Sequence, residues 1–131
     1  MNRGMAQYKS VGLEASVQTA SPHQLIAMLL RGALEAVARA EGSIERGDIG
    51  TRSTQINKAI AIVLELKGSL DSDKGGEVAA NLDQLYGFVV RELTLANREN
   101  SVARLKGVNK IIVEIADGWG SIPPEHHRQI D

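Results

Sequence analysis

The sequence has no cysteine and few aromatic side chains. Among its 131 residues the aromatics are Tyr8, Tyr86, Phe88 and Trp119, which make up 3% of the chain. The absence of cysteine excludes a disulfide framework and a thiol nucleophile, and it fits a reducing compartment. With so few rings, the core must be built from Leu, Ile, Val and Ala, which favours closely packed helices over a sandwich or barrel.

Neither a strong net charge nor a long apolar run is present. The formal net charge is −1, so there is no electrostatic reason to expect a nucleic-acid partner, which would need a basic stripe. No apolar run approaches the roughly 20 residues that span a bilayer, and the N-terminus lacks the apolar stretch of a secretory signal. We therefore expect one cytoplasmic domain over residues 1–131, with no membrane insertion.

Residues that would carry metal or catalytic chemistry are missing from the necessary positions. A di-iron helical bundle needs Glu-x-x-His pairs, and none of the histidines, His23, His126 and His127, follows a glutamate at that spacing. We expect His23 to be exposed or locally hydrogen-bonded, and the other two to be solvated, with adventitious metal binding as the weaker alternative. Gly75-Gly76 lacks the pattern of a phosphate loop. The sequence predicts no cofactor, no metal site and no enzyme.

The stretch from Gly75 to Asn97 has apolar residues at helical spacing. One row recurs at steps of three, four or seven residues, and a second row lies beside it on the same helix. The helix is therefore apolar over more than half its girth, which is wider than the roughly 100° stripe of a surface helix. It is either central in a bundle or lends a face to a partner. The two rows are Val78, Leu82, Leu85, Val89 and Ala96, and Ala79, Tyr86, Val90 and Leu93.

Three further helices are marked by their ends. Ser21-Pro-His-Gln24 is a capping box that starts a helix reaching Arg46, and Gly47 is its natural stop. Asp48 can cap a helix that ends near Gly68 to Leu70, and Ser101 can cap a last helix that ends around Trp119. No stretch alternates with the period of a strand.

These signals predict an all-α fold, an antiparallel up-down four-helix bundle, with short segments at both ends of the chain. Residues 1–20 form a weak amphipathic segment that we expect to pack as an N-terminal cap, with a disordered terminus as the alternative. Residues 120–131 form a polar tail. The apolar residues of the cap are Tyr8, Val11, Leu13 and Val17.

The expected helices over residues 21–46 and 75–97 carry more apolar surface than a four-helix core uses. Spare apolar rows on adjacent helices make a groove, and the usual occupant is an amphipathic helix of a partner. The alternative is that the N-terminal segment fills the groove and the domain binds nothing. Periodicity alone does not choose between the two.

Four blocks of the sequence resemble one family. Residues 21–34 (SPHQLIAMLLRGAL) resemble the S-P-x-x-L-I-x-M-L-Y-D-G-A-L signature of the flagellin-specific export chaperones, the FliS family. Residues 70–97 resemble its second block, with Gly-Gly-Glu, Asn-Leu and Leu-Tyr in order. Residues 8–13 are similar to its N-terminal Y-x-x-V segment, and residues 116–119 to its closing A-x-x-W. The sequence departs from the signature at Leu30-Arg31, where an aromatic-acidic pair is usual, and at Phe88.

The resemblance implies a cytosolic chaperone that binds the C-terminal segment of flagellin, prevents its premature polymerisation and keeps it competent for export. It implies a monomer that binds its client 1:1, with the flagellar export apparatus as a further partner. Asn81 and Asn97 would hydrogen-bond the client backbone, unless they cap helices or bond between them, and Trp119 would belong to the core. The groove contacts that we expect are Leu30, Leu34, Asn81, Leu85, Tyr86, Val89, Val90, Leu93 and Asn97.

Another class of function is compatible with the same groove. A helical adaptor or regulatory bundle would bind a different amphipathic helix, or self-associate through the groove. Mixing the protein with a C-terminal flagellin peptide and measuring the size of the product separates this class from the chaperone.

The groove assignment predicts the effect of two substitutions. Replacing Tyr86 or Leu93 by a charged residue is expected to abolish client binding while helicity stays largely intact, because a charge in an apolar contact is costly. Circular dichroism and a binding assay measure the two effects. A variant that unfolds instead would assign the side chain to the core.

Overall fold

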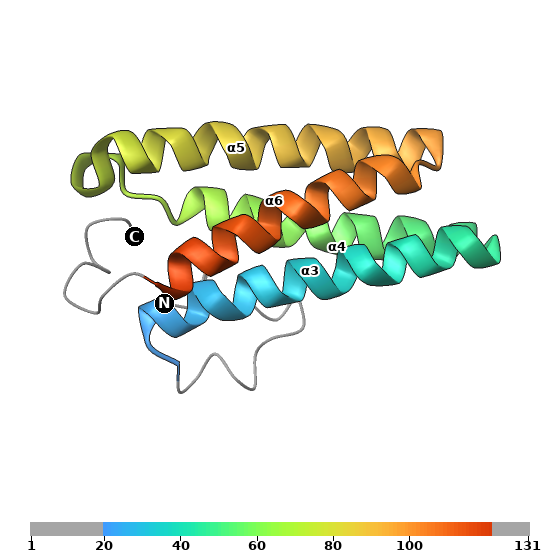
Figure 1. Cartoon of the computed structure of the whole chain (residues 1–131), viewed down its shortest axis with the longest axis horizontal. Helices are drawn as coiled ribbons and strands as arrows, with labels where there is room; N and C mark the ends of the chain where they lie inside the picture. Colours follow the sequence, from blue (N-terminus) through green and yellow to red (C-terminus); the bar gives the residue numbers. More distant parts are fainter. Residues whose placement is uncertain (1–19, 122–131) are drawn as a thin grey trace.

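The computed structural model describes residues 20–121, which form four helices. In chain order these are α3 (Pro22–Arg46), α4 (Ile49–Gly68), α5 (Ser72–Glu99) and α6 (Val102–Gly120). They run lengthwise beside one another, up and down in turn, and short connections join them at alternate ends (Figure 1). The described residues contain no strand. The predicted all-α antiparallel four-helix bundle is confirmed. The predicted N-terminal cap, with Tyr8, Val11, Leu13 and Val17, lies outside the described residues, as does the tail from residue 122.

The helix starts follow from local hydrogen bonds that the sequence signals. At α3 the backbone N–H of Gln24 donates to Ser21 Oγ at 3.2 Å, and the Ser21 N–H donates to Gln24 Oε1 at 2.8 Å. This is the predicted capping box, and it pairs backbone donors that the first helical turn leaves without a partner. Gly47 ends the helix with a φ of 73°, in the left-handed region that favours glycine. Asp48 and Ser101 cap α4 and α6 as expected.

Helix α5 begins earlier than the predicted Gly75. The Asp71 side chain accepts hydrogen bonds from two backbone N–H groups of the first turn, both at 3.1 Å, so that helix formation starts at Ser72. Gly76 then interrupts the helical geometry with a φ of 53° and a ψ of −127°. The helix therefore bends after its first turn, and the long straight part follows the bend.

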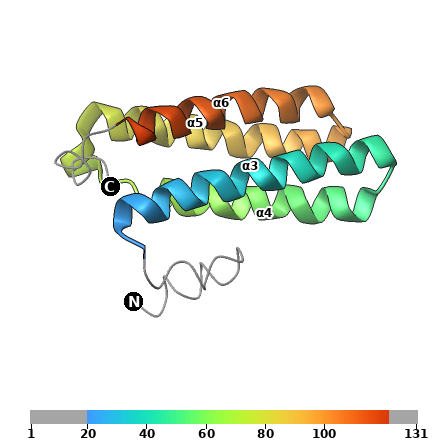
Figure 2. The ribbon, with the colours of Figure 1, turned by 60° about the horizontal axis from the view of Figure 1, so that its bottom comes forward.

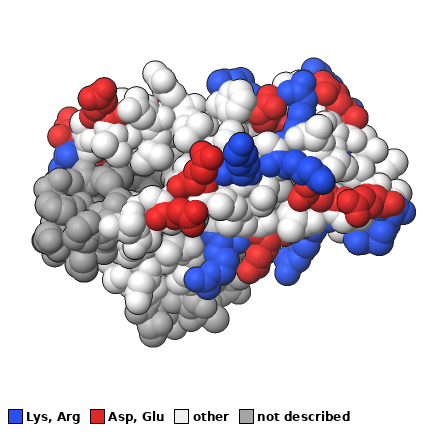
Figure 3. All heavy atoms as spheres, in the orientation of Figure 1, with Lys and Arg blue, Asp and Glu red and all other residues white. Residues whose placement is uncertain are grey.

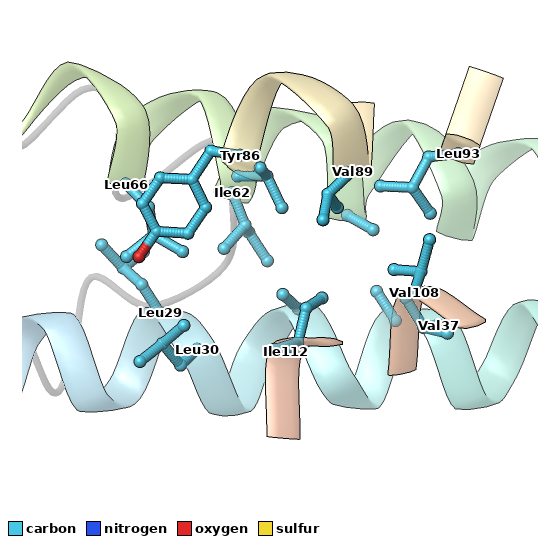
Figure 4. Packing of buried hydrophobic residues seen from close by; sticks show 14 of the residues in the cluster. Leu29, Leu30, Val37, Ile62, Leu66, Tyr86, Val89, Leu93, Val108 and Ile112 are labelled. Carbon is cyan, nitrogen blue, oxygen red and sulfur yellow. The ribbon is translucent and has the colours of Figure 1, made fainter. Parts of the chain in front are cut away.

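The core lies along the bundle axis and is almost entirely aliphatic. Figure 4 shows Val89 and Leu93 of α5 pointing toward Val108 and Ile112 of α6. The α3 helix lies across the core from α5. Alanines on α3 are fully buried, and α3 and α4 make the most extensive contact in the bundle. Small side chains there allow the two helices to approach closely. The buried alanines of α3 are Ala33, Ala36 and Ala40.

The contact between α5 and α6 is the least extensive among neighbouring helices. At one end of the bundle, Arg104 at the start of α6 donates to both carboxylate oxygens of Glu92 on α5 at 2.9 Å, and to Glu99 at 2.9 Å. From that end α6 crosses the bundle obliquely, so that its C-terminus lies beside the start of α3 (Figures 1 and 2). The two helices are thus joined at one end and diverge toward the other.

No helix of the described part of the chain has the length and apolar character needed to cross a membrane.

Substitution of two glycines separates backbone strain from packing. A Cβ added at Gly76 meets no atom within 4 Å, and the same holds for Gly107 within α6. Gly76→Ala is expected to lower the free energy of unfolding by about 1–3 kcal/mol because of its positive φ. Gly107→Ala is expected to raise it by about 0.5–1 kcal/mol. Urea unfolding followed by circular dichroism measures both, and equal effects of the two substitutions would contradict the bend at Gly76.

Candidate functional site

The divergence of α5 and α6 leaves an apolar cleft at one end of the bundle. Its volume is about 270 Å³, and all four helices together with the connection between α4 and α5 contribute to its walls. We call this the end cleft. The residues that line it are Ile26, Leu30, Leu66, Ser69, Leu70, Val78, Leu82, Tyr86, Glu114, Ile115, Gly118 and Trp119.

Trp119 holds the end of α6 on α3 and so keeps the cleft open. Its indole Nε1 donates a hydrogen bond to the backbone oxygen of His23 at 3.0 Å. The indole also stacks on the His23 ring, with centroids 4.7 Å apart and planes 15° apart. The prediction that Trp119 belongs to the core is confirmed. The expectation for His23 was incomplete, because its main contact is this ring across the bundle.

A second hollow lies between α3 and α6. Its volume is about 250 Å³, and it shares Leu30 and Trp119 with the end cleft. These two side chains are 1% and 6% exposed and separate the two hollows. We call the second one the side groove, and its lining residues are Ala27, Leu30, Arg31, Leu34, Ala116, Trp119 and Gly120.

Few polar atoms face the end cleft. The Ser69 hydroxyl donates to the Leu66 carbonyl at 2.7 Å and is satisfied within its own helix end. Tyr86 is only 3% exposed, and its hydroxyl end points toward α3 near Leu29 and Leu30 (Figure 4). Burial raises the pKa of the Tyr86 phenol to about 12. The site is therefore suited to apolar side chains of a partner.

The described residues hold no cluster of three metal-ligating side chains.

The structure brings part of the predicted groove together. Leu30 and Tyr86 line the end cleft, and Leu30 and Leu34 line the side groove. Asn81 is exposed and Leu85 is half-buried, and both follow Val78 at helical spacing on α5. Neither of the two lines the end cleft or the side groove.

Other predicted groove residues lie elsewhere. Val89 and Leu93 are completely buried in the core, and Val90 is half-buried against it. Asn97 accepts hydrogen bonds from Arg52 Nε at 3.0 Å and from Ser53 Oγ at 3.1 Å, which is the interhelix alternative. The sequence-based groove thus extended too far along α5. Tyr86 is also in the core, at 3% exposed, although it contributes to the cleft wall. A charged residue at Leu93 or Tyr86 is therefore expected to unfold the protein rather than to leave helicity intact.

The sequence analysis did not assign several residues that line the two hollows. They come from the ends of four different elements, and only the oblique path of α6 brings them together. One available signal was Leu70, an apolar residue within a polar turn, and another was Val78, which begins the apolar row of α5 and is 51% exposed. The missed residues are Ile26, Leu66, Ser69, Leu70, Val78, Leu82, Glu114, Ile115, Gly118 and Trp119 in the end cleft, with Ala27, Arg31, Ala116 and Gly120 in the side groove.

Comparison with known proteins gives consistent matches over nearly the whole chain. The family model described as "Flagellar protein FliS" matches residues 4–126. A flagellar secretion chaperone FliSB of Pseudomonas aeruginosa is 42% identical over 120 residues, covering 92% of this chain and 95% of the relative. The flagellar secretion chaperone FliS of Salmonella typhimurium is 41% identical over 123 residues, covering 93% and 91%. That of Vibrio cholerae is 37% identical over 127 residues, covering 97% and 93%.

The Tyr86 phenol gives a test of how dry the end cleft is. Its pKa is raised from 10.0 to about 12 in the folded protein. The folded protein favours the neutral phenol, and this adds to the free energy of unfolding. The contribution is fully present below the unfolded pKa, near pH 10, and is lost as the pH rises toward 12. Two pKa units correspond to about 2–3 kcal/mol of unfolding free energy.

Urea unfolding between pH 9 and pH 12 measures this loss of unfolding free energy, because the range brackets the pKa shift. The Tyr86→Phe variant should not show the loss. The difference in tyrosinate absorbance between wild type and Tyr86→Phe reports Tyr86 directly. Ionisation of Tyr86 near its ordinary pKa would contradict a desolvated cleft.

Proposed function

The chain belongs to the FliS family of flagellar secretion chaperones, and we propose that it binds the C-terminal segment of newly made flagellin in the cytoplasm. The binding prevents premature polymerisation of flagellin and keeps it competent for export. The protein acts as a monomer that binds one client, without a cofactor and without catalysing a reaction. The observation that supports this most is the open apolar end cleft.

The size and character of the two hollows suit a client that is unstructured when free. Ordering such a segment costs about 1–2 kcal/mol per residue in backbone entropy. Burial of apolar surface returns about 25 cal/mol per Å², so several side chains must enter apolar hollows together. Two separate apolar hollows allow more anchors than one pocket would.

The segment before α3 has a role in the same proposal. Ala20 leads into the end of α3 that borders both hollows, and we propose that the segment before it acts as a cover. Tyr8, Val11, Leu13 and Val17 would cover the apolar surface before a client arrives, and competition with the client would moderate its affinity. The export apparatus would receive the loaded complex.

The test of the proposed function uses two aliphatic residues of equal exposure. Val78 lines the end cleft and Leu64 lies on the outer face of α4, and each is 51% exposed. Val78→Asp is expected to weaken binding of the flagellin C-terminal segment by at least about tenfold, because a carboxylate replaces an apolar contact. Leu64→Asp should bind as the wild type does. Titration calorimetry measures the affinity, and light scattering after size exclusion gives the 1:1 mass.

Circular dichroism checks that both variants remain folded, which their exposure leads us to expect. Failure of the wild type to bind flagellin, or self-association through the cleft, would favour the adaptor class. Equal loss in both variants would remove the end cleft from the binding surface.

A further inference from the structure

One part of the end cleft wall lies outside the straight helices. It is the connection from α4 together with the first turn of α5, residues 69–76, and it ends at the bend at Gly76. Ser69 and Leu70 from this segment line the end cleft. Figure 1 shows the first turn of α5 set apart from the straight part of the helix at this end of the bundle. We call residues 69–76 the rim segment.

The rim segment makes its hydrogen bonds within itself and with the end of α4. The Asp71 carboxylate accepts from the backbone N–H groups of Asp73 and Lys74, and the Gly75 N–H donates to the Asp71 carbonyl at 2.7 Å. Of the hydrogen bonds and ion pairs described for residues 69–71 and 73–76, none reaches α3 or α6. The turn can therefore keep its own hydrogen bonds when its position on the bundle changes.

Leu70 is the only apolar side chain of the rim segment. It is half-buried and packs against the core. Asp73 and Lys74 are exposed, and Figure 3 shows acidic and basic side chains on the surface at the end where α5 begins. These charges stay in water when the segment moves, so the apolar contact of Leu70 is the main one that a movement must break.

Glycines stand at both ends of the rim segment. Gly68 is the last residue of α4, and Gly76 is the bend in α5, with a φ of 53°. A Cβ added at either glycine meets no atom within 4 Å, so neither position is packed against a neighbour. Glycine adopts a wider range of backbone angles than other residues, and hinges are formed by a few residues at the ends of elements. The two glycines therefore give the segment a pivot on each side.

We propose that the rim segment is a lid of the end cleft, which pivots at Gly68 and Gly76 and is held shut by Leu70. The lid opens to admit the flagellin segment, and an apolar side chain of the client takes the place of Leu70. The inference rests on the proposed function and adds to it the regulation of the same site. The closed lid covers apolar surface of the empty protein, and only the open fraction of the molecules binds the client.

Spin labels on the lid and on α6 measure the opening. Because the chain has no cysteine, Lys74→Cys and Lys110→Cys place one label on the lid and one on α6, and both positions are exposed. Asn57→Cys with Lys110→Cys is the matched control pair, because Asn57 is exposed on α4 outside the lid. Double electron–electron resonance should show a longer distance between the lid and α6 when the flagellin segment is bound, and an unchanged distance for the control pair.

A substitution of Leu70 tests what holds the lid shut. Leu70→Ala should associate with the flagellin segment about 3- to 10-fold faster than the wild type, because a larger fraction of the molecules is open. Val78→Ala is the matched control, since Val78 also lines the end cleft but lies after the bend. Loss of a contact with the client changes mainly the dissociation rate, so Val78→Ala should dissociate faster and associate as the wild type does. Stopped-flow fluorescence of Trp119, which lines the cleft, measures both rates.

The outcomes distinguish the lid from the proposed function. An unchanged distance between the lid and α6 in a complex that forms, or equal association rates of Leu70→Ala and Val78→Ala, would overturn the lid and leave flagellin binding intact.

The free protein tests the lid without a client. There Leu70→Ala should lengthen the distance between the lid and α6, and an unchanged distance would overturn the lid. If the distance lengthens while the wild type fails to bind flagellin, the proposed function falls and the lid itself stands. Circular dichroism verifies that each variant is folded.

Discussion

The arrangement of α6 is the constraint on which the rest of the structure depends. One end of this helix is tied to α5 by Arg104, which binds Glu92 and Glu99. The other end is tied to α3 by Trp119, through one hydrogen bond and one ring stack to His23. A helix fixed to different neighbours at its two ends must cross the bundle obliquely. The end cleft is the space that this crossing leaves beside α5.

The contacts of Arg104 and Trp119 determine the path of α6 more than they stabilise the fold. The ion pairs of Arg104 are partly exposed to solvent, and such pairs contribute little to stability. Most of the stability comes from the aliphatic core, in which side chains such as Leu93 and Ile112 are shielded from water. Within residues 20–121, hollows lie where α6 leaves α5 and between α3 and α6. The aliphatic core therefore supports the end cleft at one end of the bundle.

An open apolar cleft also creates a risk. Apolar surface that no neighbour covers favours aggregation, and Val78 and Phe88 remain substantially exposed on α5. The same exposure is what a chaperone for an aggregation-prone segment requires, since its client must find a surface comparable to its own assembly contacts.

Local features of the structure were predictable from the sequence, and long-range features were not. The capping box at Ser21 and the glycine stop at Gly47 depend on residues within one turn, so their spacing reveals them. Val89 and Val78 illustrate the limit, because both belong to one apolar row of α5, yet one is in the core and the other faces the cleft. Periodicity gives the face of a helix, whereas the distance to the neighbouring helix decides what that face contacts.

The contact of His23 with Trp119 joins residues 96 positions apart, and no local pattern announces it. The bend at Gly76 was likewise hidden, because a glycine pair in a polar turn fits either a loop or a kinked helix start. The extent of the candidate site could therefore not be derived from the sequence, although Leu30, Leu34 and Tyr86, three of the predicted residues, contribute to the walls of the two hollows.

Methyl NMR of the complex tests the central claim most directly. With Ile, Leu and Val methyl groups labelled in this chain and the flagellin C-terminal segment unlabelled, intermolecular NOEs report which side chains touch the client. The account predicts NOEs from Val78, Leu82 and Ile115 in the end cleft. NOEs confined to Ile49 and Leu64, the exposed aliphatic residues of α4, would contradict it.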